Sequence, residues 1–464
     1  MADVRSLLAA AVGAGRVLAP GDPIADYTHD EALGIAPGEP AFVVEPGSTA
    51  EVAAVLCAAG EAGLGVTARG AGTGMSGGAN PGHGGVVVAF GKMNRILDID
   101  GANGVAVVQP GVTLAQLDEA AAAAGLVFPV FPGEMSATIG GTIATNAGGM
   151  RAVKYGVTRN HVLGLEVVLA SGEVVRTGGK HVKSSSGYDL TQLIVGSEGT
   201  LALVTEAVVR LYPRLEFQAT VLAPFASAEQ VMQAVPRIIA TGIGPLICEY
   251  VDMLTMAAIT ARDDIDLGIP AAVRESAPAY LVVTVEERTA ERLEAAVAEL
   301  AEELNALGAD DVYVPAVPAA RRLIEAREKA FWAAKAAGAD DIVDAVVPRA
   351  AMAGFFAEIT QAAADSSGGL VAGCGHAGDG NVHLAVFQPD TAARQALLRQ
   401  IFAAAVARGG AVSGEHGIGI AKREYFLELA DPVALRLMRG VKQAFDPSGI
   451  LGPGALLRDK GGAA

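Results

Sequence analysis

Short apolar runs alternate with longer segments of helical period through the first half of the chain. Helices are predicted from Ser48, which stands three residues before Glu51 as in a capping box, and over 113–125. An amphipathic helix is expected over 7–18, before the Pro20-Gly21-Asp22 turn. Five apolar runs have the length of strands: 41–45, 64–69, 85–90, 96–99 and 105–109. A further pair, 163–169 and 173–177, predicts a hairpin around residues 170–172.

The pattern changes after Pro213. Residues 219–222 and 280–286 predict strands, and helical periods cover 227–241, 289–307 and 318–338. Strands and long helices in this arrangement predict an antiparallel α+β domain of ferredoxin-like style. With 464 residues, the chain exceeds one ordinary hydrophobic core, so two or three domains are expected.

Charge and cysteine content narrow the possible partners and compartments. The chain has 34 Lys and Arg against 51 Asp and Glu, a net charge of -17, and no basic run, which excludes a nucleic-acid face. Three widely spaced cysteines indicate a reducing compartment rather than a disulfide framework. No long uninterrupted apolar stretch predicts a membrane span. We therefore expect a cytoplasmic protein, either free or peripheral on the inner face of a membrane.

Two glycine-rich segments predict a ligand-binding surface made of backbone. The first, 69–78, contains Gly72-Thr73-Gly74-Met75-Ser76-Gly77, but a strand rather than a helix is predicted to follow, so the dinucleotide pattern of a Rossmann loop does not apply. Its backbone N–H groups suit a diphosphate, and a flexible surface loop is the alternative. The second, 132–149, is polar and rich in glycine, and predicts a loop lying against a large planar ligand.

The densest chemistry lies in 373–383 and 413–417, which together hold three of the seven histidines. A Gly-Asp-Gly-Asn turn between His376 and His383 lets their imidazoles approach each other. Two imidazoles and the carboxylate of Glu415 form a reasonable ligand set for a divalent transition ion with open positions. The alternative, that both histidines only form hydrogen bonds within a tight hairpin, stays open on spacing alone.

These blocks resemble the flavin domain of the vanillyl-alcohol oxidase, or PCMH, superfamily. The histidine stretch resembles the C-terminal domain of its FAD-linked D-2-hydroxy acid dehydrogenase branch, the D-lactate dehydrogenase and glycolate oxidase flavoprotein type. The resemblance runs from about Tyr27 to Gly454. It implies an α+β fold with a helical lead-in (1–36), a PCMH-type FAD-binding domain of two subdomains (37–214), an antiparallel substrate and metal domain (215–420), and a C-terminal segment that returns to the flavin (421–464).

The resemblance also implies which residues hold FAD. The first glycine loop would bind the pyrophosphate, and the later segments would contact the ribityl and isoalloxazine groups. No His or Cys lies within 67–78, so non-covalent FAD is expected. Gly452 and Ala455 stand where the family usually has Asn and Lys in the closing segment. The implied contacts are Arg69, Gly70, Ala71, Gly72, Thr73, Gly74, Met75, Ser76, Gly77, Pro132, Gly133, Glu134, Ser136, Thr138, Gly141, Thr145, Asn146, Ala147, Gly148, Glu198, Gly199 and Val204.

By the same resemblance, Arg327 clamps the substrate carboxylate, although a surface position is its alternative. A Zn²⁺ or Mn²⁺ ion on His376, His383 and Glu415 would lower the pKa of the substrate hydroxyl. His416 would take that proton, and flavin N5 would accept the hydride. The alternative for His416 is a hydrogen bond within its loop, with a metal-bound hydroxide or another residue as the base.

The implied substrate is a small D-2-hydroxy acid. Ala385 and Ile342 stand where D-2-hydroxyglutarate enzymes have polar and lysine residues, which favours a monocarboxylate such as D-lactate, glycolate or a longer apolar acid. Three alternatives stay open: a D-2-hydroxyglutarate dehydrogenase, a flavin subunit inactive without electron-transfer partners, and a metal-free sugar-lactone or alcohol oxidase. Electrons would pass to oxygen, a quinone, a cytochrome or an electron-transfer flavoprotein. The oligomeric state, including a homodimer, stays open.

Overall fold

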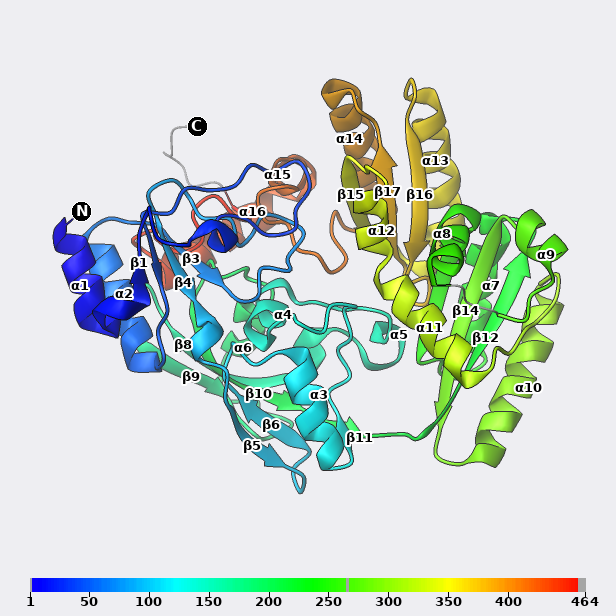
Figure 1. The fold of residues 1–464 in the computed structure, drawn as a ribbon, viewed down its shortest axis with the longest axis horizontal. Coiled ribbons are helices and arrows are strands. Elements are labelled where there is room, and N and C mark those ends of the chain that lie inside the picture. The colour runs from blue at the N-terminus through cyan, green and yellow to red at the C-terminus, as the bar shows by residue number, and fades with distance from the viewer. Residues whose placement is uncertain (1, 264–266, 458–464) are drawn as a thin grey trace.

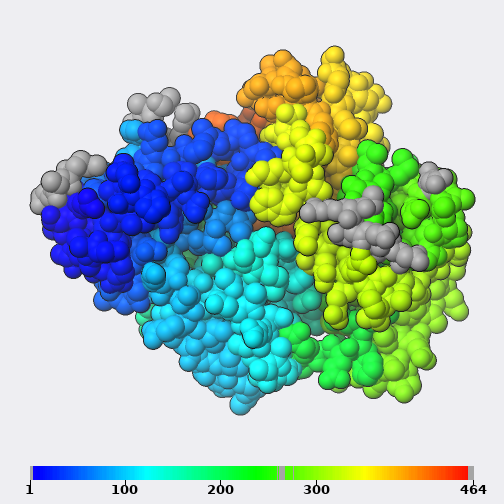
Figure 2. Space-filling model, viewed as in Figure 1, coloured from blue at the N-terminus to red at the C-terminus, as the bar shows by residue number. Residues whose placement is uncertain are grey.

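The computed structural model describes residues 2–263 and 267–457. Figure 1 shows two bodies of secondary structure, one carrying the N-terminal half and one carrying a tall sheet of later strands. The chain passes between them after β11, and its last helices return to the first body. In Figure 2 the yellow surface formed near residues 320–340 lies against the blue N-terminal part, where Lys335 Nζ pairs with Glu31 at 2.7 Å.

The first body begins with a four-stranded sheet in the order β1-β2-β4-β3. β4 lies between β2 and β3 and runs parallel to both. The apolar side chains Val52, Val55 and Leu56 pack on this sheet and have no exposed surface. The bounds are α1 Ala2–Val12, β1 Val17–Leu18, β2 Phe42–Val44, α2 Thr49–Glu61, β3 Val66–Arg69 and β4 Val86–Ala89.

A five-stranded antiparallel sheet follows, in the order β5-β6-β10-β8-β9. Along β10 buried residues alternate with less buried ones, as expected for a strand with one face on a core. Residues of α3 and α4 complete this core. The bounds are β5 Ile96–Asp100, β6 Val105–Val108, α3 Leu114–Ala123, β7 Leu126–Val127, α4 Ile139–Thr145, α5 Ala152–Tyr155, β8 Val162–Val168, β9 Val174–Gly178, α6 Leu190–Ile194, β10 Leu203–Arg210 and β11 Tyr212–Pro213.

The second body is built on a six-stranded antiparallel sheet in the order β12-β14-β13-β16-β17-β15. Residues of α7, α10, α13 and α14 pack on one face, and residues of α8 and α11 pack on the other. The bounds are β12 Phe217–Phe225, α7 Ala228–Ala240, β13 Ile247–Asp252, α8 Met253–Asp263, α9 Ala271–Ser276, β14 Ala279–Glu287, α10 Ala290–Ala306, α11 Val317–Glu328, α12 Ala330–Ala336, β15 Asp341–Val346, α13 Met352–Asp365, β16 Leu370–Gly375, β17 Asn381–Phe387, α14 Thr391–Ala407, α15 Arg423–Leu429 and α16 Pro432–Phe445.

The predicted α+β class and the antiparallel second sheet are confirmed. The strand-to-strand nature of the first glycine loop is also confirmed, because no helix separates β3 from β4. The helix expected over 7–18 was wrong in its bounds, since α1 ends at Val12 and Val17–Leu18 forms a strand. The helix expected over 318–338 is two helices, α11 and α12. Among the described helices, none is both long and apolar enough to cross a membrane.

Two further predictions need correction. Ser48 does cap α2 by accepting from Glu51 N, but the Glu51 carboxylate accepts from Gly47 N at 2.7 Å and pairs with Arg16 instead of completing a capping box. The segment 132–149 is not only loop: Ile139 and Ile143 of α4 are fully buried. Since they are four residues apart, they lie on one helical face.

Candidate active site

The two histidines of the predicted turn lie at the end of the β16–β17 hairpin. His383 on β17 is opposite Cys374 on β16, and the turn carries His376 back toward it. The two ring centroids are 4.8 Å apart, with the ring planes at 82°. The expected approach of the imidazoles is therefore confirmed.

Glu415 lies between these imidazoles. Its Oε1 is 3.1 Å from His376 Nε2 and 3.2 Å from His383 Nε2. The three ligand atoms all lie within 4.8 Å of one another. His383 Nε2 is also 3.5 Å from Asp344 Oδ1. Two imidazole nitrogens and a carboxylate oxygen directed at one point fit a divalent transition ion such as Zn²⁺ or Mn²⁺.

A buried carboxylate on β13 orients His376. Glu249 is fully buried, and its Oε1 lies 2.6 Å from His376 Nδ1. Because that contact occupies Nδ1, Nε2 remains directed at Glu415 and the point that a cation would fill. Burial opposes the protonated form of His376, but Glu249 and then Glu415 outweigh it and raise the His376 pKa well above its usual value. The site therefore attracts positive charge.

Arg327 is buried, with an exposed fraction of 6%, so the surface alternative is wrong. It lies in the last turn of α11, and its guanidinium pairs with Glu249 Oε2 at 2.6 Å. The same guanidinium lines the cavity that reaches His376 and His383. Glu249 thus holds both a metal-ligand candidate and the predicted carboxylate clamp, and the sequence reasoning missed it. Its only signal was an acid within the apolar run 246–251.

A second buried carboxylate, Asp344 on β15, organises the Glu415 loop. It is fully buried and accepts from Ser413 Oγ at 2.5 Å, His416 N at 2.9 Å and Asn381 Nδ2 at 2.9 Å. Lys422 Nζ pairs with it at 3.2 Å. Burial raises the Asp344 pKa, but the charge of Lys422 and the contact with His383 oppose burial, and that pKa lies well below its usual range. The sequence reasoning treated Asp344 only as part of a strand.

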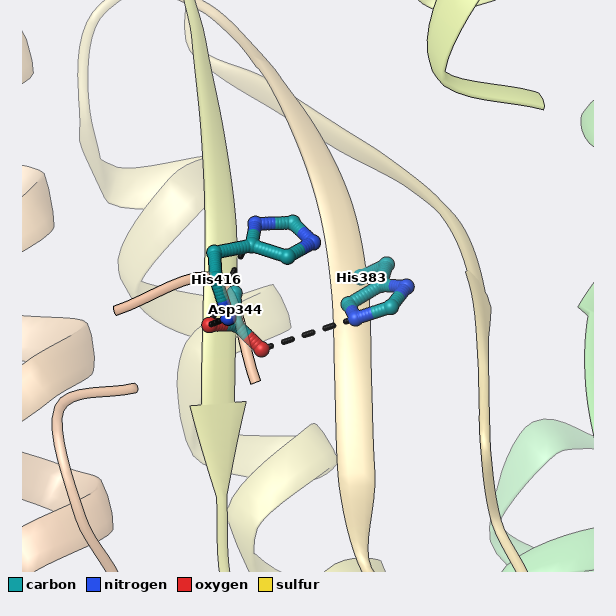
Figure 3. A group of neighbouring side chains, drawn as sticks. All are labelled: Asp344, His383 and His416. Atoms are coloured by element: carbon teal, nitrogen blue, oxygen red, sulfur yellow. Dashed lines mark hydrogen bonds and ion pairs between the residues drawn. The ribbon is translucent and has the colours of Figure 1, made fainter. Parts of the chain in front are cut away.

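His416 stacks on His383 beside Asp344, as Figure 3 shows. The ring centroids are 4.7 Å apart, with the planes at 29°. Its Nδ1 is 3.9 Å from Asp344 Oδ2 and makes no hydrogen bond among the described residues. Burial lowers the His416 pKa to about 3, against the attraction of Asp344. A neutral imidazole with a free nitrogen can accept a proton, whereas the loop hydrogen bond offered as its alternative role is not formed by this side chain.

One cavity of about 430 Å³ joins this cluster to the glycine-rich segments of the first body. His376, His383, Glu415 and His416 line one part of it. Its wall also holds most of the residues that the resemblance assigned to cofactor contacts: Gly70, Ala71, Gly72, Thr73, Gly74, Met75, Ser76, Pro132, Gly133, Glu134, Thr138, Gly141, Thr145, Ala147, Glu198 and Gly199.

Six of the assigned residues do not line this cavity: Arg69, Gly77, Ser136, Asn146, Gly148 and Val204. The Arg69 guanidinium instead donates to the main-chain oxygens of His29, at 2.6 Å, and Asp26. Asn146 caps α4 with φ 55 and accepts from Arg159 N. The wall also includes residues that were not expected, among them Thr142, Met150 and Phe131. α4 places Thr142 there, and that helix was not predicted.

Both bodies hold the loop that carries Glu415 and His416. From the first body, Ser76 Oγ donates to the carbonyl oxygens of His416 and Gly417 at 3.0 and 2.9 Å. Glu198 accepts from Ile418 N at 2.8 Å and Gly419 N at 2.6 Å. The Glu198 carboxylate is thus used to fix the loop. The site is built across the boundary between the two bodies.

Two family models together match most of the chain. A model described as FAD binding domain matches residues 40–178, and one described as FAD linked oxidases, C-terminal domain, matches residues 214–456. The chain belongs to the FAD-linked oxidase family. Its relatives there include proteins named D-lactate dehydrogenase, glycolate oxidase subunit and D-2-hydroxyglutarate dehydrogenase.

Two relatives show how far the similarity of this FAD-linked oxidase extends. An uncharacterized FAD-linked oxidoreductase of Mycobacterium tuberculosis is 54% identical over 460 residues, which is 99% of this chain and 100% of the relative. A D-lactate dehydrogenase of Anaerostipes hadrus is 37% identical over 462 residues, covering 95% and 94% of the two chains. The fold is also that of p-cresol methylhydroxylase with substrate bound, with a TM-score of 0.79, 17% identity, and 100% and 98% coverage.

The glycine wall of this oxidase fits FAD. Among the described contacts, the backbone N–H groups of residues 72–75 donate to no protein acceptor, so they remain available to phosphate oxygens. The resemblance placed the closing segment over the flavin, but none of its described residues lines the cavity. That segment instead extends beside β3, where Val66 N donates to Ile450 O at 2.7 Å. Gly452 there has φ 57, a conformation that favours glycine.

Proposed function

We propose that this FAD-linked oxidase converts a D-2-hydroxy acid with a single carboxylate, such as D-lactate or glycolate, into the 2-oxo acid. The observation that carries the proposal is one cavity that is lined by the glycine loops, the buried Arg327 and the His376, His383 and Glu415 ligand set. A relative of 37% identity is named D-lactate dehydrogenase. When bound, FAD supplies a hydride acceptor, and a divalent cation supplies a Lewis acid.

The side chains of the cavity account for the other requirements of this reaction. Arg327 Nη2 pairs with Glu249 Oε2 at 2.6 Å, which fixes the guanidinium, while its Nε makes no hydrogen bond within the described chain and remains available to a carboxylate. His416 lines the cavity beside His383 and is the candidate acceptor of the hydroxyl proton. Burial keeps its imidazole neutral by lowering its pKa to about 3, which also makes it a weak base, so the proton transfer would depend on a bound cation that lowers the pKa of the substrate hydroxyl.

A second carboxylate on the substrate would find no partner in this cavity. Arg327 is the only Lys or Arg side chain among the described residues of its wall. Ile342 and Ala385 lie where a cation or polar group would be needed near the histidines. An unpaired carboxylate is costly to bury. This favours a monocarboxylate over D-2-hydroxyglutarate.

The test is anaerobic mixing of the purified FAD-bound protein with D-lactate, L-lactate and D-2-hydroxyglutarate while flavin absorbance is followed. We expect bleaching with D-lactate, loss of bleaching after chelation, and recovery with Zn²⁺ or Mn²⁺. The His383→Ala variant should keep FAD but lose bleaching. Bleaching that survives both chelation and His383→Ala would overturn the proposed metal site and favour a metal-free oxidase. No bleaching by any hydroxy acid would favour a flavin subunit that needs partners such as a quinone-reactive protein, a cytochrome or an electron-transfer flavoprotein.

A further inference from the structure

One face of the second sheet runs from the histidines into an apolar part of the same cavity. Side chains two residues apart on a strand lie on the same face. His383 on β17 is followed on its face by Ala385 and then Phe387. On the neighbouring strands, Ile342 and Ala372 lie opposite Ala385, and Leu370 lies opposite Phe387. These five apolar residues all line the cavity: Ile342, Leu370, Ala372, Ala385 and Phe387.

The residues between them belong to the opposite face. Val343, Leu384 and Val386 are buried in the core that the sheet shares with α7, α13 and α14. The strand register therefore separates a structural face from a cavity face, and the apolar rows of the cavity face are not needed to pack those helices. We name the part of the cavity bounded by Ile342, Leu370, Ala372, Ala385 and Phe387 the apolar annex.

Apolar side chains also cover the annex from the helices of that face. α8 contributes Leu254 and Ala258, and the α12 region contributes Phe331, Ala334 and Ala337. Lys335 on α12 is absent from the described wall and pairs with Glu31 of the first body. At the far end, Leu370 is 48% exposed, although it is a large apolar residue in a strand. Thr255 of α8 also lines the cavity, so the covering helices are mostly apolar, whereas the rows on the sheet are apolar throughout. The annex is open to solvent at Leu370, at the end away from the histidines.

We propose that the apolar annex binds the hydrocarbon chain of the substrate, so that the preferred substrates are unbranched D-2-hydroxy acids of medium chain length. This inference rests on the proposed function, since the carboxylate and hydroxyl must be held at Arg327 and the histidines. The distance from His383 to Phe387 along β17 is about 13 Å. At about 1.2 Å per bond of an extended chain, that length spans about eleven bonds, so a chain of about eight to ten carbons lies within it.

The experiment measures anaerobic flavin bleaching of the FAD-bound, metal-loaded protein with unbranched acids from D-lactate to D-2-hydroxydecanoate. The bleaching rate constant divided by the apparent Kd should rise about fourfold for each methylene buried, as far as about eight carbons. D-2-hydroxypentanoate should exceed D-2-hydroxyglutarate, which has the same carbon skeleton with a terminal carboxylate, by at least about tenfold.

Two variants on neighbouring residues test where the chain lies. The chain-length preference is the value for D-2-hydroxyoctanoate divided by the value for D-2-hydroxypentanoate. Phe387→Ala removes a ring from the far row of the annex and should lower this preference about tenfold. Val386→Ala removes apolar atoms from the adjacent residue on the opposite face, and should leave that preference unchanged. The preference is a ratio measured on folded, FAD-bound protein, so a loss of stability in either variant does not change it.

The outcomes separate this inference from the proposed function. A series that is flat or falls with chain length, while D-lactate still bleaches the flavin, overturns the annex and leaves the proposed function standing. A preference for D-2-hydroxyglutarate over D-2-hydroxypentanoate also overturns it, as does an equal effect of Phe387→Ala and Val386→Ala. Absence of bleaching by every acid of the series overturns both.

Discussion

Replacing Asp344 with Asn tests whether one buried carboxylate holds the catalytic loop. The substitution keeps the size of the side chain and removes its charge. In the native site both carboxylate oxygens accept: Oδ1 from Asn381 Nδ2, and Oδ2 from Ser413 Oγ and His416 N. An asparagine has a single acceptor oxygen, so its amide nitrogen must face a donor in either orientation.

The size of the effect follows from the burial of the partners. Lys422 is 5% exposed and lies 3.2 Å from Asp344 Oδ2, so the substitution leaves a buried ammonium without its paired carboxylate. Breaking a buried ion pair on one side costs about 3–5 kcal/mol. Since domains are stable by only about 5–15 kcal/mol, this is a large fraction of the total. Glu358→Gln is the matched control in the same body. The Glu358 side chain is 53% exposed and its partner Arg408 is 26% exposed, so this surface pair is worth about 0–1 kcal/mol.

Trp332 is the chain's only tryptophan and lies in α12, so its fluorescence reports unfolding of the second body. Urea titration in the presence of a chelator removes the contribution of metal binding. We expect the midpoint reported by Trp332 to fall by about 1–2 M for Asp344→Asn, and by much less for Glu358→Gln. Because two domains need not unfold in one step, the midpoint of this transition is compared, not a global free energy. Equal midpoints for the two variants would refute the assigned role of Asp344.

Two further predictions concern two other carboxylates: Glu249 behind His376, and Glu328 on the cavity wall. Glu249→Gln should weaken Zn²⁺ binding by about 10–100-fold in calorimetric titration, because His376 Nδ1 loses the carboxylate that orients it. Unchanged affinity would show that Glu249 serves Arg327 alone. Glu328 has a buried Oε1 without a hydrogen bond among the described residues, and burial raises its pKa to about 7. The folded state therefore retains a proton that the unfolded chain releases near pH 4.3, roughly its usual pKa, and native stability falls as pH rises from there to about 7. The melting temperature of Glu328→Gln minus that of the native protein should therefore increase between pH 5 and pH 8. A difference that stays constant over this range would contradict the prediction.

Local features of the site could be predicted from the sequence because neighbouring residues build them. The turn between His376 and His383 depends on glycines within that same segment, and the pair of strands around it is short-range. The strand-to-strand character of the first glycine loop likewise follows from the apolar runs on either side. Glu415 could be added because it lies in the second glycine-rich loop with a third histidine. These predictions needed no knowledge of distant contacts.

The supporting carboxylates could not be found in this way. Glu249 is 127 residues from His376, and the register of β13 and β16 brings them together. Asp344 meets His383 through the register of β15 and β17. Resemblance identified the first glycine loop as part of the cavity wall, but it did not give the direction of every side chain in it. Arg69, for example, turns toward main-chain oxygens of residues 26 and 29. The high glycine content of 132–149 favoured a loop prediction, although the four-residue spacing of Ile139 and Ile143 indicates a helix.

The position of Glu415 and His416 depends on both bodies at once. Asp344 fixes their main chain from the sheet side, while Ser76 and Glu198 fix the following residues from the side of the glycine loops. At Gly148 a Cβ atom would lie 2.6 Å from Glu415 Oε2, so the backbone of the first body reaches the carboxylate that we propose as a metal ligand. A displacement of one body against the other therefore moves the carboxylate and the imidazole relative to His376 and His383. The arrangement of His376, His383 and Glu415 is thus correct only when the two bodies are correctly docked.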